Sequence, residues 1–158
     1  MPHMFSKWLG HIGFFAFAAA APLWLLACTH KTTTDKNIDY VNSVEAEQLI
    51  HGEKRLFGLA GTAKAVFVDP RTPADFRTEH IPGAINVPYE DLTEDYTILK
   101  EYDVVIVYGS DYNDPRALGY SKSLIELGHK DVRTLNGGLR AWKADGNPVE
   151  TGDAKPAT

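Results

Sequence analysis

Short continuous apolar runs alternate along the chain with longer stretches of helical spacing. Apolar runs at 65–68, 84–87, 104–108 and 132–135 predict strands. The run from Val104 to Tyr108 is the strongest, because five β-forming residues follow one another without a polar position, as in a central parallel strand buried on both faces. The alternation predicts an α/β fold with a central, mostly parallel sheet and helices on both faces.

Residues typical of helix starts stand before the helical stretches. Asn42 or Ser43 can cap a first helix, with Glu45 placed as in a capping box. The pairs Thr72-Pro73 and Asp114-Pro115 open two more helices, the second ending at Gly128, and Gly137-Gly138 introduces the last one.

The chain has 158 residues, 44% of them hydrophobic, which predicts one globular domain. We expect this domain at 38–147. Residues 28–37 are polar and predict a tether, and the unpatterned residues 148–158 predict a flexible tail.

The first 27 residues have the pattern of a secretory signal. Lys7 precedes an apolar run at 12–26, which is shorter than the roughly 20 residues of a spanning helix. The run ends in Leu25-Leu26-Ala27-Cys28, which resembles the lipobox of bacterial lipoproteins. The resemblance implies a signal peptide at 1–27 and an acylated Cys28 that holds the protein to a lipid bilayer of the bacterial cell envelope. Thr29 after the cysteine would favour the outer membrane, facing the periplasm, in a Gram-negative cell.

Charge narrows the range of partners. The chain carries 16 Lys and Arg against 21 Asp and Glu, a formal charge of −5. This balance argues against an electrostatic footprint for nucleic acid or for anionic lipid headgroups.

Three blocks of the chain together resemble a rhodanese-like domain. They are VDPRTPADFRTEHIPGAINVP at 68–88, the strand at 104–108 with the loop and helix after it, and LNGGLRAW at 135–142. The resemblance covers nearly all of 38–147 and implies the rhodanese-like fold. It also implies thiosulfate-type sulfurtransferase activity, for which active members use a cysteine directly after the central strand.

That position is occupied here by Gly109, which has no side chain, and Cys28 is the only cysteine of the chain. Six residues separate Gly109 from Arg116, whereas the family's sulfurtransferases commonly have four and its phosphatase branch five. Asp111 and Asp114 add negative charge where the family holds an anion. The sequence therefore predicts a catalytically inactive relative with no catalytic residue, no cofactor and no metal site, acting as a binding or scaffolding module for an unidentified protein partner in the envelope.

We expect any binding site in the loop after the central strand, because ligands of open α/β sheets bind beyond the carboxyl ends of strands. The candidate residues are Gly109, Ser110, Asp111, Tyr112, Asn113, Asp114 and Arg116. Tyr112 either packs onto the sheet edge or faces a partner.

Two alternatives stay open at this point. The chain could be a sulfurtransferase or hydrolase with a non-cysteine or partner-supplied nucleophile, or a sensor that binds a small ligand at loop 109–116. Ser110 would need a general base, and His51, His80 and His129 lie outside the loop segment.

Overall fold

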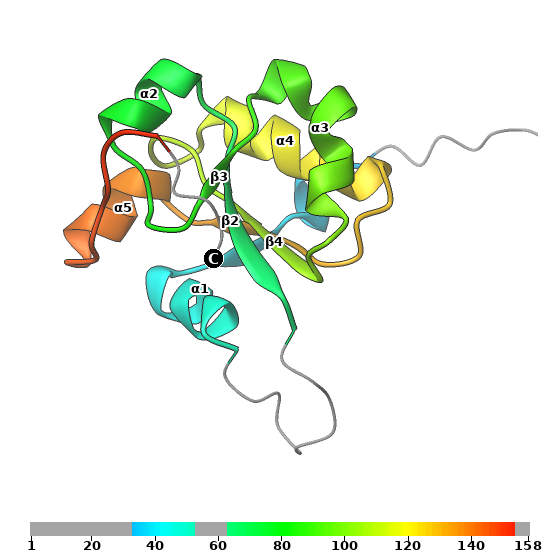
Figure 1. Ribbon diagram of the computed structural model, residues 1–158. Helices are drawn as coiled ribbons and strands as arrows, with labels where there is room; N and C mark the ends of the chain where they lie inside the picture. The colour runs from blue at the N-terminus through cyan, green and yellow to red at the C-terminus, as the bar shows by residue number, and fades with distance from the viewer. Residues whose placement is uncertain (1–32, 53–62, 154–158) are drawn as a thin grey trace, which may run out of the picture. The chain divides into compact units, whose positions relative to one another are not determined.

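The computed structural model describes residues 33–52 and 63–153. A five-stranded parallel sheet lies at the centre, in the order β1-β5-β4-β2-β3 (Figure 1). The strands are β1 (Asp39–Val41), β2 (Ala65–Asp69), β3 (Ile85–Asn86), β4 (Val104–Val107) and β5 (Val132–Leu135). The expected α/β fold with a parallel sheet is confirmed, and the strongest predicted strand is the middle one, β4.

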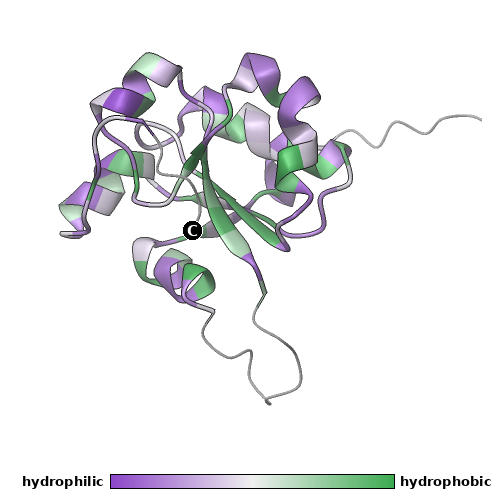
Figure 2. Ribbon diagram, in the orientation of Figure 1, coloured by the Kyte–Doolittle hydropathy of each residue, from purple (hydrophilic) through white to green (hydrophobic). Residues whose placement is uncertain are grey.

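Helices cover both faces of the sheet. Helices α1 (Ser43–Ile50), α2 (Pro73–Thr78) and α5 (Gly138–Ala144) contribute to the hydrophobic cluster of one face, and α3 (Leu92–Leu99) and α4 (Pro115–Glu126) to that of the other. Two short 3₁₀ helices, η1 (Asp35–Asn37) and η2 (Tyr89–Asp91), complete the secondary structure of the described residues. Figure 2 shows the hydrophobic residues concentrated in the strands and the hydrophilic ones on the outer helix surfaces.

Neighbouring positions of the central strands belong to opposite faces. Ile106 packs with Phe67 in the first cluster, whereas Val105 and Val107 pack in the second. Phe67 meets Trp142 of α5 edge to face, with ring centroids 5.2 Å apart. Both faces of β4 are therefore buried, which explains its uninterrupted apolar sequence.

The capping residues act as the sequence predicts. The side chain of Asn42 accepts a hydrogen bond from the N–H of Glu45 in a full capping box, and Thr72 Oγ1 accepts one from the N–H of Asp75. Asp114 caps α4 and Pro115 begins it. No pattern in the sequence predicted β1, which has three residues, or α3, whose sequence LTEDYTIL lies between the first and second blocks.

The ordered part of the chain extends beyond both expected limits of the domain. Thr33 donates its N–H to Glu126 Oε1 at 3.1 Å, so part of the expected tether packs on α4. At the other end, Glu150 pairs with His80 through two backbone hydrogen bonds, and Trp142 Nε1 donates to Pro148 O at 2.7 Å. The expectation of a flexible tail from residue 148 is wrong for 148–153, because backbone pairing holds this segment without any apolar pattern.

The expected signal peptide at 1–27, with Cys28, lies outside the described residues, as do 154–158. Among the residues that are described, no helix is long and apolar enough to cross a membrane.

Candidate functional site

The loop between β4 and α4 lies at the carboxyl end of the central strand. Tyr108 directly follows the strand and is fully buried, and Gly109 after it is also buried. The next residues, Asp111, Tyr112 and Asn113, are exposed before the chain returns to the buried Asp114. The middle of the loop is therefore exposed to solvent, whereas the residues at its two ends are buried.

The side chain of Asp114 fills the base of the loop. Its Oδ2 accepts a hydrogen bond from the N–H of Ser110 at 2.8 Å, and its Oδ1 accepts one from the N–H of Arg116 at 2.9 Å. A Cβ added to Gly109 would lie 2.5 Å from Asp114 Cβ and 2.7 Å from its Oδ2. The space that a side chain at position 109 needs is thus taken by the chain's own carboxylate.

This environment favours the charged form of Asp114. Burial acts to raise the pKa of its carboxyl, but the N–H groups of Ser110 and Arg116 and the charge of the Arg116 guanidinium outweigh burial and lower the pKa below its ordinary value. The loop amides are therefore paired with an internal anion.

Arg116 also lies among carboxylates. Its Nε is 3.5 Å from Asp114 Oδ1, and its Nη1 is 3.9 Å from Asp75 Oδ2 on α2. Its Nη2 donates to Ser110 Oγ at 3.4 Å. The guanidinium is thus shared by two carboxylates, and it is the group that faces the hydroxyl of Ser110.

The start of α5 closes the other side of the loop. Leu139 and Arg140 donate their N–H groups to the carbonyls of Gly109 and Ser110 at 2.9 and 3.0 Å. A Cβ on Gly138 would lie 2.4 Å from Gly109 O, so only glycine permits this approach. The Gly137-Gly138 pair noted in the sequence therefore holds the loop as well as starting a helix.

Tyr112 combines the two arrangements that the sequence left open. Its ring packs on the backbone of α5, where a Cβ added to Gly137 would lie 2.7 Å from Tyr112 Cε1. The residue is nonetheless 57% exposed. Tyr112 is thus fixed in place and displayed at the surface.

The backbone of the loop has one residue of unusual conformation, Asn113, which adopts a φ of 61°. The φ of Gly109 is not positive, so lack of space for a side chain, and not backbone conformation, accounts for the glycine there. No cluster of His, Cys, Asp and Glu suited to a metal occurs in the described segments.

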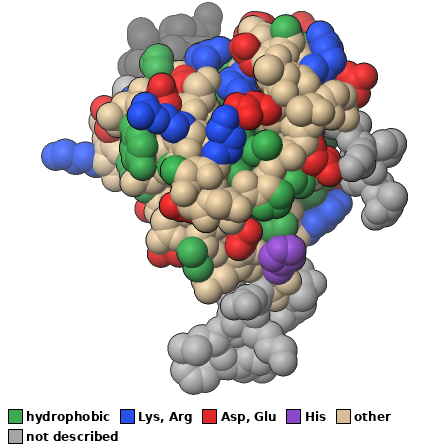
Figure 3. Space-filling view, turned by 90° about the vertical axis from the view of Figure 1, so that its left-hand side faces the viewer, with side chains coloured by type: hydrophobic (Ala, Val, Ile, Leu, Met, Phe, Trp, Pro, Cys, Tyr) green, Lys and Arg blue, Asp and Glu red, His purple; other side chains and the backbone are tan. Residues whose placement is uncertain are grey.

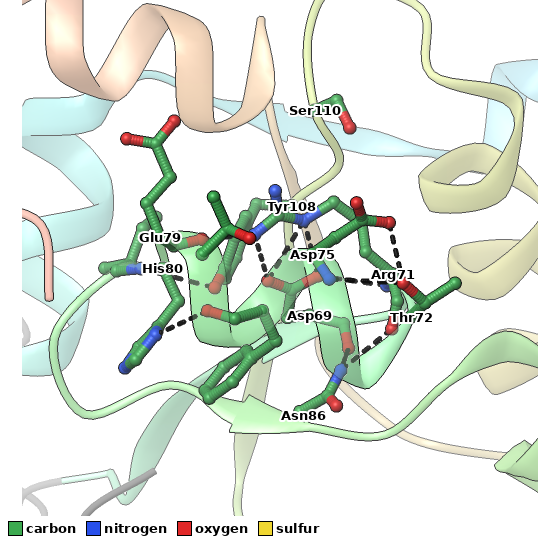
Figure 4. Close-up of polar contacts among 12 residues, drawn as sticks. Asp69, Arg71, Thr72, Asp75, Glu79, His80, Asn86, Tyr108 and Ser110 are labelled. Carbon is green, nitrogen blue, oxygen red and sulfur yellow. Dashed lines mark hydrogen bonds and ion pairs between the residues drawn. The ribbon is translucent and has the colours of Figure 1, made fainter. Parts of the chain in front are cut away.

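Below the loop, Asp69 and Arg71 fix the end of β2 (Figure 4). Arg71 Nη2 lies 2.6 Å from Asp69 Oδ2, both side chains are buried, and Arg71 also donates to the carbonyl of Glu79 at 2.8 Å. Burial raises the pKa of Tyr108, whose hydroxyl accepts a hydrogen bond from the N–H of Ile81 at 3.3 Å. The Asp69–Arg71 pair therefore fixes the turn after β2.

His80 is also structural. Its Nδ1 lies 2.9 Å from the carbonyl oxygen of Phe76, and the two rings stack with centroids 3.8 Å apart. The sequence missed Asp75 as a partner of Arg116. The adjacency of β2 and β4 would have pointed to it, because α2 begins just after β2.

The surface on the side of α2 and α5 mixes both signs of charge (Figure 3). Lys143 pairs with Glu79 at 2.6 Å, and Arg77 lies 3.8 Å from Asp153. Acidic and basic groups therefore neutralise one another locally on this face.

Comparison with known proteins assigns the family. The family model "Rhodanese-like domain" matches residues 54–145. A protein named Sulfurtransferase from Allochromatium vinosum is 33% identical over 110 residues, which cover 69% of this chain and 94% of the relative. Thiosulfate sulfurtransferase PspE of Escherichia coli is 31% identical over 85 residues, covering 52% of this chain and 79% of the relative. SseB of Mycobacterium tuberculosis is 29% identical over 109 residues, and the chain spans only 38% of its length.

Solved structures agree with this assignment. The rhodanese-like domain of the Anabaena protein Alr3790 has a TM-score of 0.57 and 29% identity, over 71% of this chain and 78% of that one. A thiosulfate sulfurtransferase from Pseudomonas aeruginosa has a TM-score of 0.61 at 24% identity, over 76% of this chain and 21% of that one, a likeness of fold. From the matched residues, the parallel sheet and these relatives, we conclude that the chain belongs to the rhodanese-like domain family.

Proposed function

We propose that this protein is a rhodanese-like domain without sulfur-transfer activity of its own, which binds or organises another protein at the bacterial cell envelope. The observation that carries the proposal is the carboxylate of Asp114 over Gly109, bonded to the loop N–H groups. A sulfurtransferase needs a thiolate in such a cradle, stabilised by those amides. In this protein Gly109 has no side chain, and the carboxylate of Asp114 accepts the hydrogen bonds of the Ser110 and Arg116 N–H groups.

The remaining groups of the loop do not supply a replacement nucleophile. The hydroxyl of Ser110 faces the Arg116 guanidinium, and a serine nucleophile needs a base that takes its proton. Asp114 is held by two amides and a cation, which reduces its nucleophilicity. These contacts favour a binding role over the alternative of an unusual catalytic residue.

The binding role rests on Tyr112. A tyrosine that is fixed against Gly137 yet 57% exposed offers a large contact area at a small cost in conformational entropy. We propose that a partner protein contacts the loop at this side chain.

Photo-crosslinking in cells tests this contact. A photoreactive amino acid replaces Tyr112 in the full chain, and the matched control replaces Tyr40, which is 48% exposed on β1. We expect one recurrent crosslinked protein from position 112 that is absent from position 40. Identical products from both positions, or none from position 112 in a folded protein, would overturn the proposed contact.

The envelope location depends on Cys28. We propose that this cysteine is acylated after removal of residues 1–27, as the lipobox resemblance implies. The Cys28→Ala variant should then accumulate as an unprocessed precursor without lipid, as measured by mass spectrometry. Mature, acylated protein from the variant would contradict the anchor.

A further inference from the structure

A pocket lies at the end of the domain opposite to the loop. It measures about 390 Å³, and Tyr96, Lys100, Tyr102, Leu127 and Lys130 are among the residues that line it. We call these five residues the lysine–tyrosine end. These residues lie near the C-terminal ends of α3 and α4, in the segments that lead into β4 and β5. They are therefore close to the amino ends of these two strands.

Two lysines of this pocket have no ion-pair partner among the described residues, and one carboxylate, that of Asp103, also lines it. In the described part of the chain, Lys100 and Lys130 have no carboxylate partner, and both are exposed. The neighbouring Lys64 pairs with Glu101 at 3.6 Å. The carboxylate of Asp103 accepts the N–H of Lys64 at 2.8 Å. The end thus presents two unpaired ammonium groups on a chain of net charge −5.

Aromatic and apolar groups accompany the lysines. Lys100 Nζ lies 5.0 Å from the ring centroid of Tyr96, and the Tyr96 hydroxyl donates to the carbonyl of Leu127 at 3.4 Å. Leu127 itself is 43% exposed. Tyrosine rings, lysines and an exposed leucine are the side chains that favour the boundary between water and lipid headgroups.

The N-terminal segment enters the domain at this same end. Thr33 is bonded to Glu126, the last residue of α4 and the neighbour of Leu127, and Asp35 lies 2.5 Å from Lys122 on the same helix. Four residues lie between Cys28 and Thr33, so five residue steps give a reach of at most about 17 Å. An anchor at Cys28 would therefore hold the lysine–tyrosine end near the bilayer.

The loop lies at the other end of α4. This helix has 12 residues and is about 18 Å long. It begins directly after the loop (Figure 1), Lys122 near its end pairs with Asp35 of η1, and its last residue, Glu126, precedes Leu127 of the lysine–tyrosine end. The two sites therefore face in opposite directions along one rigid helix.

We propose that the lysine–tyrosine end is a membrane-contact surface that binds the phosphate-bearing headgroups of the leaflet in which Cys28 is anchored. Lys100 and Lys130 pair with headgroup phosphates, while Tyr96, Tyr102 and Leu127 lie at the headgroup boundary. The loop with Tyr112 then points away from the bilayer. This inference rests on the lipid anchor of the proposed function.

Site-specific fluorescence on membranes tests the orientation. The full acylated chain is reconstituted into vesicles of phosphatidylethanolamine with a minority of phosphatidylglycerol, and a polarity-sensitive dye is attached to one introduced cysteine. Ile98→Cys reports on the last turn of α3, two residues before Lys100, and Asp111→Cys reports on the loop tip. Both positions are exposed, and acylation blocks Cys28 itself.

We expect a blue shift and brighter emission at position 98 on vesicles, and water-like emission at position 111. The double variant Lys100→Glu, Lys130→Glu should lose the signal at position 98. The control Arg140→Glu, an exposed cation on α5 beside the loop, should keep it. Water-like emission at position 98 in an acylated chain, or a membrane signal at position 111, would overturn the orientation alone. A chain shown by mass spectrometry to lack acylation would overturn the anchor and this inference with it.

Discussion

Replacing Gly109 by alanine adds a single methyl group to the most crowded point of the loop. The new Cβ would lie 2.5 Å from Asp114 Cβ, whereas carbon atoms pack at about 3.5–4.0 Å. One side chain or the loop backbone must therefore move by about an ångström. Overpacking of this kind costs about 1–3 kcal/mol, so we expect Gly109→Ala to lower the free energy of unfolding by that amount.

A double-mutant cycle attributes the cost to Asp114. Asp114→Gly removes the three atoms nearest to the added Cβ, and glycine is tolerated at a helix N-cap, although the bonds to Ser110 and Arg116 are lost. In the Asp114→Gly background, Gly109→Ala should therefore lower the free energy of unfolding by about 1–2 kcal/mol less than it does in the wild type. Asp114→Ala is the matched control, because it keeps the offending Cβ and should leave most of the cost in place.

Urea unfolding measures all these variants. Trp142 is 3% exposed in the fold, so its fluorescence changes when the domain unfolds. An equal cost of Gly109→Ala in the wild-type and Asp114→Gly backgrounds would refute the claim that Asp114 fills the space above position 109.

Three other predictions concern the charges and the ends of the fold. Because the pKa of Asp114 is lowered in the fold, its charge stabilises the protein above the unfolded-state value of about 4, and this contribution is lost as pH falls through the lower folded-state pKa. The stability gap between wild type and Asp114→Asn should therefore be constant near neutral pH and shrink below about pH 4; a gap that grows on acidification would contradict the sign. Arg71→Ala should lower the free energy of unfolding by about 3–5 kcal/mol, because it leaves the fully buried Asp69 carboxylate without its cation; an unchanged melting temperature would exclude that role. Truncation after Asn147 removes two backbone bonds to His80, one backbone bond to Arg77 and one bond to the Trp142 indole, so the free energy of unfolding in urea should fall by about 4 kcal/mol, and a truncated domain as stable as the full chain would show that 148–153 contributes nothing.

Much of the fold was predictable because the relevant signals are local. The buried run of β4, the capping box at Asn42 and the proline that begins α4 each specify structure within a few residues. By contrast, β1 has three residues and is defined by its pairing with β5, a long-range contact that leaves no periodic pattern. The order of 148–153 depends in the same way on backbone pairing with His80.

The candidate site was predictable in composition but not in arrangement. The loop, the missing thiol, the acidic residues and the helix start at Asp114-Pro115 were all identifiable from the sequence. In the fold Asp111 is exposed, whereas Asp114 turns inward and accepts the N–H groups of Ser110 and Arg116. The cap of α4 is a local signal, but the position of the Asp114 carboxylate over Gly109 depends on tertiary packing that no sequence pattern shows.

Sulfur transfer by the purified full chain tests the central claim most directly. Thiosulfate and cyanide are supplied together, thiocyanate is measured, and Cys28→Ala is assayed in parallel so that an unacylated thiol cannot be mistaken for a site in the loop. The account predicts a rate equal to that of buffer for both proteins. Thiocyanate formed above the buffer rate by both proteins would contradict it, because the domain would then transfer sulfur without a cysteine beside Asp114.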